Sequence, residues 1–209
     1  MSYGVKLEVW SDYACFTRTE MKVERVSYDV ITPSAARAIL QSIHWKPAIQ
    51  WHINKIHVLN EIKFANIKRN EVGSKMLPKN PYLNVVDNRT QRFSMILKDV
   101  RYIIEANFSL TDKKGEEDTE EKHISIAKRR MQLGQTFNQP YLGCREFSCG
   151  FKLLEDESEI PESFYKGEAE KDLGFMLHDI DFTNNNQPQF FRAIMKNGVI
   201  DTKRAEVIS

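Results

Sequence analysis

Alternating side chains between positions 100 and 110 constrain the fold of this 209-residue chain more than any other feature. Every second residue of this stretch is apolar: Val100, Tyr102, Ile104, Ala106, Phe108 and Leu110. A period of two is typical of a strand with one buried face and one wet face. Residues 4–10 repeat the pattern with Val5, Leu7 and Val9. Both stretches therefore predict strands of a sheet that is covered on one side.

A first helix is predicted between these two strands. Thr32 is suited to the N-cap, and Pro33 follows at the first helical position, where proline is favoured. Pro47 forbids continuation, so the helix should end near Ile43.

A second helix is predicted from Asp118 to Gly134. Asp118 and Glu121 have the spacing of a capping box, and Gly134 is suited to a left-handed C-cap. Lys122 and His123 lie in its first turn, so a cation stands beside the one side chain that titrates near neutral pH.

Two further strands are predicted at residues 48–59, with a bulge near Asn54-Lys55, and at residues 144–154. The resulting order, strand-helix-strand-strand-helix-strand, is that of the ferredoxin-like fold. We therefore expect an α+β protein whose residues 1–154 form a ferredoxin-like (RRM-like) domain. Residues 155–209, with strand candidates at 173–182 and 190–195, are expected to form a small C-terminal antiparallel β extension. The RRM version of the fold places RNA bases on its open sheet face.

The overall charge excludes a global electrostatic attraction for nucleic acid. There are 30 Lys and Arg against 29 Asp and Glu, so any polyanion site must be a local patch. The three cysteines have no CxxC spacing, which argues against a disulfide framework or a zinc site and favours a reducing cytoplasm. No signal peptide and no membrane-spanning run are predicted, so a cytoplasmic location is expected.

Aromatic and basic side chains alternate in the irregular connection at residues 11–31, as a flexible RNA strand requires. Residues 63–92 are basic and loop-like, and we interpret them as a flexible hairpin or arm. The candidate RNA-binding residues are Tyr13, Lys22, Arg25, Lys46, Arg69 and Arg145. The block LGCREF at 142–147 has two interpretations. Its glycine could permit a close approach of RNA with Arg145 on a phosphate, or it could form a tight turn with Arg145 paired to a carboxylate such as Glu146.

Several blocks carry a family resemblance in order along nearly the whole chain. They are SDYACFTRTEMKVERVSYDVITPSAARAIL followed by QSIHWKPAI, then IHVL, KRNEV, EKH, LGCREF and DLGFMLHDIDF. Together they resemble the fifth CRISPR-associated protein family in its subtype I-C form. Between residues 81 and 92 the chain is shorter than the family pattern.

The resemblance implies an endoribonuclease that cuts CRISPR repeat hairpins in the precursor transcript. It also implies that the protein stays bound to the 5′ handle of its product in the type I-C surveillance complex, in antiviral defence. The expected partners are this RNA, the backbone and large subunits of the complex and, in the assembled complex, target DNA. The family's catalytic trio corresponds here to His44, Lys122 and His123. Some members have tyrosine where this chain has His44.

Metal-free RNA cleavage needs a base for the 2′-hydroxyl, charge relief on the phosphorane and an acid for the leaving 5′-oxygen. Two imidazoles and an ammonium can fill these roles and yield a 2′,3′-cyclic phosphate and a 5′-hydroxyl. Lys122 would hold the phosphate, and His44 and His123 would share the base and acid roles in an order that the sequence leaves open. The acidic runs around 116–121 and 155–159 fit solvated turns better than a metal site, so neither metal nor cofactor is expected. The alternative function is a non-catalytic subunit that binds the 5′ handle and aids assembly.

Overall fold

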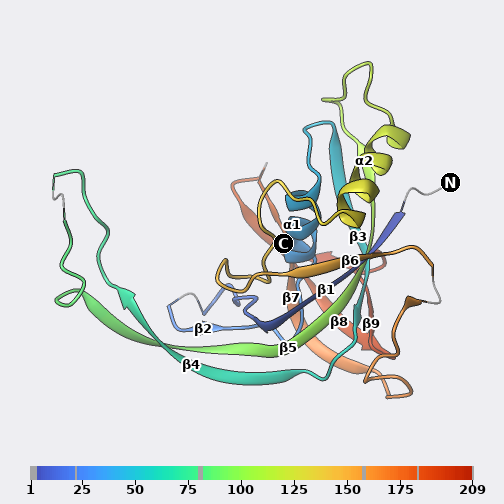
Figure 1. Ribbon diagram of the computed structural model, residues 1–209. Helices are drawn as coiled ribbons and strands as arrows, with labels where there is room; N and C mark the ends of the chain where they lie inside the picture. Colours follow the sequence, from blue (N-terminus) through green and yellow to red (C-terminus); the bar gives the residue numbers. More distant parts are fainter. Residues whose placement is uncertain (1–3, 22, 80–81, 157–158, 183, 209) are drawn as a thin grey trace.

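The long strand β5 (Arg89–Leu110) is the centre of the fold (Figure 1). The computed structural model describes residues 4–21, 23–79, 82–156, 159–182 and 184–208. The second half of β5 pairs antiparallel with β1 (Gly4–Ala14) and with β3 (Ile49–Val58). The other edge of β1 pairs with β6 (Gly150–Leu154), which gives the strand order β3-β5-β1-β6. With two helices, α1 (Pro33–Ile43) and α2 (Glu120–Gln132), the protein has the expected α+β class.

The helices cover the apolar face of the sheet, which the alternating residues 100–110 predict to be buried. Tyr102, Ile104 and Ala106 of β5 are buried in the main core cluster, together with Leu40 of α1 and Ala127 of α2. The pairing of β3 with β5 shifts register between Ile53 and Lys55, so the predicted bulge is confirmed. Among the described residues, no helix is long and apolar enough to cross a lipid bilayer.

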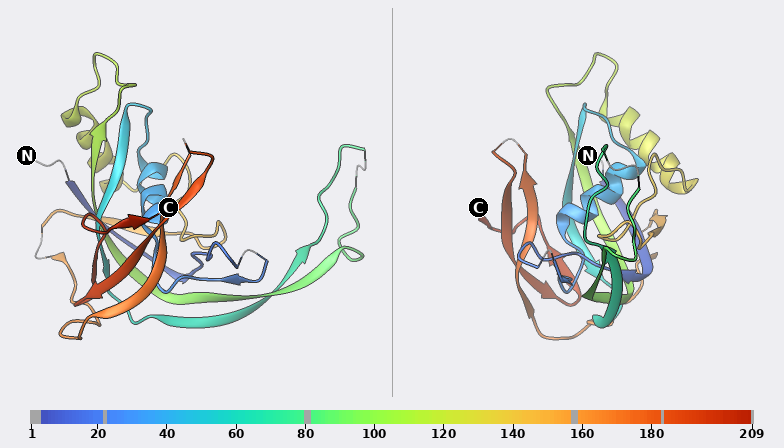
Figure 2. Two further views of the ribbon diagram at one scale, coloured as in Figure 1. Left: turned by 180° about the vertical axis from the view of Figure 1, so that it is seen from behind. Right: turned by 90° about the vertical axis from the view of Figure 1, so that its left-hand side faces the viewer.

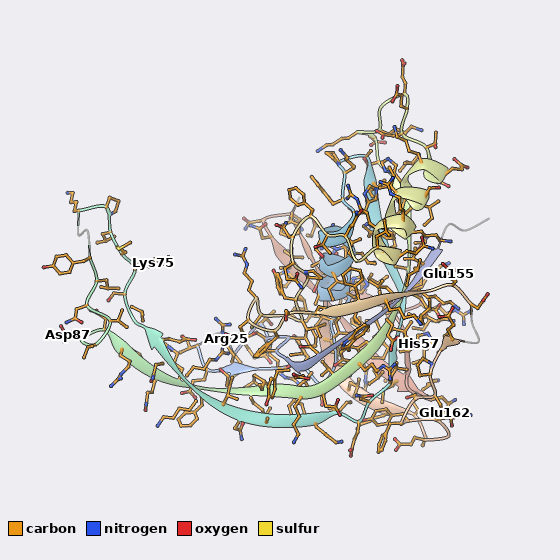
Figure 3. All side chains as sticks on the ribbon, viewed as in Figure 1. Arg25, His57, Lys75, Asp87, Glu155 and Glu162 are labelled. Atoms are coloured by element: carbon orange, nitrogen blue, oxygen red, sulfur yellow. The ribbon has the colours of Figure 1, made fainter. Side chains whose placement is uncertain are left out.

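A curved two-stranded arm extends from the body (Figures 1 and 3). β4 (Lys63–Val72) pairs with the first half of β5, and Lys75 and Asp87 lie toward the far end of the hairpin. The hairpin interpretation of residues 63–92 is thus confirmed, but their loop-like character is wrong for residues 63–72 and 89–92, which form strands. No residue of β4 is fully buried, but every second one is half-buried, and Ala65 and Ile67 pack against a small cluster of Cys15, Ile96 and Cys144.

The predicted connections also contain more order than expected. β1 continues to Ala14, and the short β2 (Arg25–Val26) pairs in parallel with β5 inside the stretch expected to be irregular. The last predicted strand of the unit, expected from residue 144, begins only at Gly150 because residues 142–147 form turns.

The C-terminal strands are β7 (Lys171–Asp181), β8 (Gln187–Lys196), β9 (Val199–Asp201) and β10 (Val207–Ile208). β7 and β10 pair with β8, and β9 pairs with both β8 and β3, so these strands continue the main sheet. β7 also packs on α1, where Arg37 forms an ion pair with Asp179. α1 therefore lies between the main sheet and the C-terminal strands (Figure 2). A domain boundary at residue 154 stays a prediction.

Candidate active site

His44 is held at the end of α1 by contacts from two other elements. It caps the helix with extended backbone angles (φ −146°, ψ 113°), and its N–H donates to the Leu40 carbonyl. Its own carbonyl accepts a 2.9 Å hydrogen bond from the Trp51 indole of β3. The preceding carbonyl, of Ile43, accepts a 2.9 Å hydrogen bond from Arg130 of α2. The backbone carbonyls at this helix end are thus satisfied by β3 and α2, which fixes His44 relative to both.

The start of α2 differs from the predicted capping box by one residue. Thr119, not Asp118, is the N-cap, and its hydroxyl accepts from the Lys122 N–H at 3.2 Å. Asp118 instead accepts from the Gly115 N–H at 2.9 Å, which leaves its other carboxylate oxygen free to meet a side chain. Both residue types are good N-caps, so the sequence alone could not choose between them. Gly134 has the expected left-handed conformation (φ 65°).

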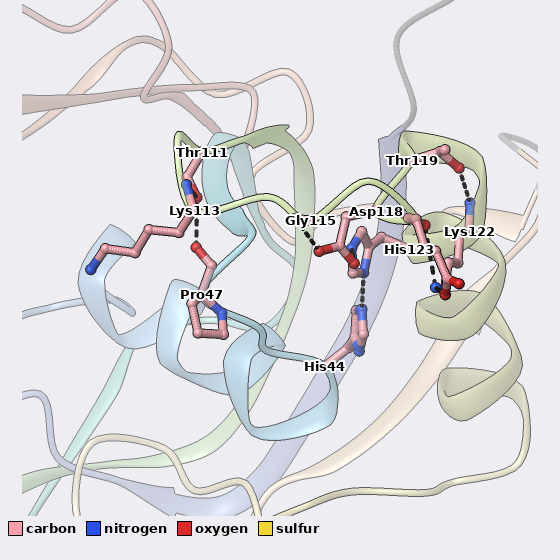
Figure 4. A network of polar contacts seen from close by, with 10 residues as sticks. His44, Pro47, Thr111, Lys113, Gly115, Asp118, Thr119, Lys122 and His123 are labelled. Atoms are coloured by element: carbon pink, nitrogen blue, oxygen red, sulfur yellow. Dashed lines mark hydrogen bonds and ion pairs between the residues drawn. The ribbon is translucent and has the colours of Figure 1, made fainter.

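The two histidines of the predicted trio meet although they are 79 positions apart. His44 Nε2 lies 3.1 Å from His123 Nδ1, and His123 Nε2 lies 3.0 Å from an Asp118 carboxylate oxygen (Figure 4). Phe108 of β5 packs edge-on against the His123 ring. Both imidazoles are buried, with 1% of His44 and 2% of His123 exposed. The result is a chain of three titratable groups, Asp118–His123–His44.

The partners determine which atoms carry protons when the two imidazoles are neutral. The Gly115 N–H and then His123 lower the pKa of Asp118, so its carboxylate is ionised and only accepts. Nε2 of His123 must then donate, Nδ1 of His123 must accept, and Nε2 of His44 must donate. Burial, assisted by the charge of Arg130, lowers the pKa of His44 to about 4, so this ring is neutral near pH 7.

Within the hydrogen-bonded group Asp118–His123–His44, one nitrogen, Nδ1 of His44, has no partner among the described residues. With Nε2 of His44 donating, its Nδ1 carries a bare lone pair, and it is buried without a hydrogen bond among the described residues. An unpaired buried acceptor is costly to the folded state. It is also an atom that can take up a proton from a bound hydroxyl. Asp118, which completes the chain, was interpreted from the sequence only as a helix cap.

Three lysines surround this chain at the protein surface. Lys46, Lys113 and Lys122 line a pocket of about 390 Å³ together with both histidines. The exposed Lys122 ammonium lies 3.2 Å from the Glu117 carbonyl oxygen and 3.5 Å from its carboxylate. Lysine residues along the lining of one small pocket favour a phosphate or another anion there.

Four of the predicted RNA-binding residues gather at the loop 142–147. Arg25 donates to the Cys144 thiol sulfur at 3.2 Å, Arg69 forms an ion pair with Glu146, and the Tyr13 ring lies 6.2 Å from that of Phe147. Arg145, within the loop, is exposed and forms no ion pair in the part of the chain that the structure describes. Lys46 lies apart from this group at the histidine pocket, and Lys22 lies outside the described residues.

The conformation of Gly143 tests the interpretation that this glycine permits a close approach of RNA. Gly143 is left-handed (φ 83°), and a Cβ there would lie 2.0 Å from the Cys15 carbonyl oxygen. The close approach that requires glycine is therefore made by the protein's own β1–β2 connection. Arg145 is not paired with Glu146, which is occupied by Arg69. The expected turn is present, the expected pairing of Arg145 with Glu146 is wrong, and a contact of Arg145 with an RNA phosphate stays a prediction.

Comparisons with known proteins agree with the family resemblance of the sequence. Residues 4–203 match the family described as CRISPR-associated protein (Cas_Cas5), in its Cas5d form. A Mannheimia succiniciproducens protein named CRISPR pre-crRNA endoribonuclease Cas5d is 51% identical over 214 residues, which cover 96% of this chain and 95% of that protein. A Thermus thermophilus protein of the same name is 42% identical over 181 residues, 87% of this chain and 75% of that protein. A solved structure named Crystal Structure of CRISPR-associated Protein has a TM-score of 0.74 at 24% identity and covers 100% of this chain and 97% of its own, a likeness of fold.

Proposed function

The chain belongs to the Cas5d family of CRISPR-associated proteins, and we propose that it is an endoribonuclease that cuts precursor crRNA at its repeat hairpins. After the cut it stays bound to the 5′ handle within the type I-C surveillance complex, in the cytoplasm. The observation that carries the proposal is the Asp118–His123–His44 chain beside three lysines. We further infer that the β1-α1-β3-β5-α2-β6 unit is ferredoxin-like, because its strand order β3-β5-β1-β6 has the pattern of that fold.

In this proposal His44 is the general base. Nδ1 of His44 takes the proton of the 2′-hydroxyl, and the resulting imidazolium is stabilised through His123 by the Asp118 carboxylate. The 2′-oxygen then attacks the adjacent phosphorus. Because Nδ1 is covered in the folded chain, a neighbouring side chain must move before RNA can reach it.

The hydrogen bond between the two rings argues against placing them on opposite sides of the phosphate. An in-line displacement needs the base and the acid at the attacking and leaving oxygens, whereas these rings touch each other at 3.1 Å. We therefore treat the pair as one proton-accepting unit. Lys122 neutralises the phosphorane and gives a proton to the leaving 5′-oxygen, after exchanging Glu117 for phosphate. The products are a 2′,3′-cyclic phosphate and a 5′-hydroxyl, and no metal takes part.

The burial of both histidines favours a second candidate, a subunit that binds the 5′ handle and does not cut. Two interior imidazoles bonded to each other and to a carboxylate could simply join the end of α1 to the start of α2. The lysine-lined pocket would serve either candidate, but the bare Nδ1 of His44 has no purpose in a subunit that only binds, and for this reason we favour the nuclease.

The test is cleavage of a labelled repeat RNA in EDTA by wild type, His123→Ala and His52→Ala. His52 is a matched control because it is an exposed histidine whose ring bonds to Ser109, outside the proposed chain. We expect wild type and His52→Ala to cut, and His123→Ala to bind the RNA without cutting. Binding without cleavage by all three proteins would assign the protein to the assembly role. Cleavage that EDTA abolishes would refute the metal-free mechanism.

Retention of the product has a kinetic consequence. An enzyme that keeps its 5′ handle completes about one cut per molecule, so we expect a burst whose amplitude equals the enzyme concentration. Sustained turnover with excess RNA would contradict product retention.

A further inference from the structure

A second groove lies on the other side of the segment that carries His44. Its volume is about 660 Å³, and it is bounded by the C-terminal end of α1 and by residues 137–141 and 145. Three aromatic rings border it with unusual exposure: Phe137 is 84% exposed, Trp45 55% and Tyr141 37%. Large apolar rings gathered at one place on a surface mark a binding site more often than a chance arrangement.

Hydrogen bonds hold the groove in this shape. The Ser42 carbonyl at the end of α1 accepts from the N–H of Phe137 at 2.8 Å and from that of Asn138 at 3.3 Å. Further along the loop, the Pro140 carbonyl accepts from the Cys149 N–H at 2.9 Å. The rings are therefore exposed by a loop that is fastened at both ends.

The polar groups of the groove suit nucleotides better than a peptide. Asn138 and Gln139 offer amides that can bond to base edges, and Arg145 offers a cation. None of the described lining residues is acidic. Aromatic rings with an arginine and amides are the combination that binds unpaired RNA. An apolar partner helix would bury these amides and the guanidinium without partners, which is costly.

The groove is also directly beside the proposed cleavage pocket. Trp45 stands between His44 and Lys46 in the chain, and both of these neighbours line the pocket of the histidine pair. The Cα atoms of consecutive residues are only about 3.8 Å apart, so the groove and the pocket border the same short backbone segment.

In the described part of the chain, the open sheet face is largely engaged in contacts within the protein. It carries the ion pairs Arg101–Glu8 and His57–Glu105. Its Ile103 is buried in a separate apolar cluster, against which Ile160 packs.

We propose that this groove binds one or two unpaired nucleotides next to the cut, stacked on Trp45 and Phe137 with Arg145 on a phosphate. The inference rests on the proposed function in that its ligand is the substrate of the neighbouring pocket. In RRM proteins the bases bind to the open face of the sheet. Here the proposed base-binding groove lies on the side of the protein that carries the helices.

The test uses repeat RNA with 2-aminopurine in turn at each unpaired position that flanks the cut. With wild type and Trp45→Phe we expect fluorescence quenching at one or two positions, and with Trp45→Ala we expect this quenching to be lost. In single-turnover cleavage, Trp45→Ala should raise the half-saturating RNA concentration about 5- to 150-fold, the range for one lost base–ring stack, with little change of rate at saturation. The matched control is Phe175→Ala, which removes a ring that is 56% exposed on β7, in a different groove.

The outcomes separate this inference from the proposed function. Cleavage and quenching that Trp45→Ala leaves unchanged would overturn the groove inference and leave the nuclease standing. Quenching that depends on Trp45 in a protein that never cuts would support the groove and refute the nuclease. If Trp45→Ala cleaves RNA and quenches 2-aminopurine as wild type does, but no longer binds another subunit of the surveillance complex, the groove binds a protein partner instead. An equal loss in Phe175→Ala would refute a site-specific role.

Discussion

The neutral, buried His44 should make the stability of the protein sensitive to acid in a measurable way. Its pKa is about 4 in the folded chain against an ordinary value of 6.5. Below pH 6.5 the unfolded chain therefore takes up a proton at this position that the folded chain does not, until the pH approaches 4. Because the unfolded state binds more protons, stability falls as pH falls through this window. Between pH 7 and pH 5 the loss attributable to His44 is about 2 kcal/mol.

The perturbation is His44→Gln, which keeps an amide N–H for Nδ1 of His123 and removes the titrating ring. Urea unfolding at pH 7 and at pH 5, for wild type and variant, gives four free energies of unfolding. The acid sensitivity of groups that do not contact His44 is common to both proteins and cancels in the double difference. We expect the variant to lose about 2 kcal/mol less than wild type over these two pH units.

His52→Gln is the control for the loss of an imidazole in general. Burial also lowers the pKa of His52, but its ring is bonded to Ser109 at an exposed position, so its double difference should be smaller. A His44→Gln variant as acid-sensitive as wild type would refute the assignment of His44 as a neutral buried base. A variant more acid-sensitive than wild type would reverse the sign of the argument.

Three further predictions concern the neighbouring groups. Asp118→Asn should lower the single-turnover cleavage rate about 10-fold or more and alter its pH profile while RNA binding persists, whereas Asp172→Asn, which removes a carboxylate paired with Arg192 of β8, should keep the wild-type profile; identical profiles for both variants would exclude a positioning role for Asp118. Lys122→Ala should impair cleavage more than hairpin binding in parallel gel-shift and cleavage assays, and an equal loss of both would make Lys122 a binding residue only. Gly143→Ala should lower the urea midpoint far more than Gly167→Ala, because both positions are left-handed but only Gly143 has a backbone atom, 2.0 Å away, where the Cβ would lie; similar midpoints would contradict the packing of this loop.

The sequence revealed those elements in which an apolar face is buried. Tyr102 and Ile104 alternate because one side of β5 packs on the helices, and the bulge after Ile53 was visible because the alternation changes phase there. The hairpin arm is only partly predictable because the half-buried face of β4 is apolar at Ala65 and Ile67 but charged at Arg69 and Glu71, which is too short an apolar pattern to indicate a strand. Arg25 gave no signal of β2 because a two-residue strand is too short for any pattern.

The candidate site was predictable in its residue types and not in its geometry. Lys122 and His123 are visible as a pair at a helix start, and His44 was identified through a family resemblance. That the two imidazoles touch depends on the packing of α1 against α2, which no local pattern encodes. The predicted N-cap role of Asp118 is wrong because aspartate and threonine are both favoured at an N-cap, and only the fold shows that Thr119 takes this position.

The pairing of β1 bears on how the protein is made. Leu7 lies opposite Ile104 on one side and Leu153 on the other, so both neighbours of the first strand are synthesised long after it. During translation β1 must wait with its apolar side chains unpaired while about a hundred residues are added, a situation that slows folding and exposes chains to aggregation. The second edge of β1 is paired only when β6 leaves the ribosome. A chain truncated before Gly150 would leave one edge of β1 without a partner, although it contains all of His44, Lys122 and His123.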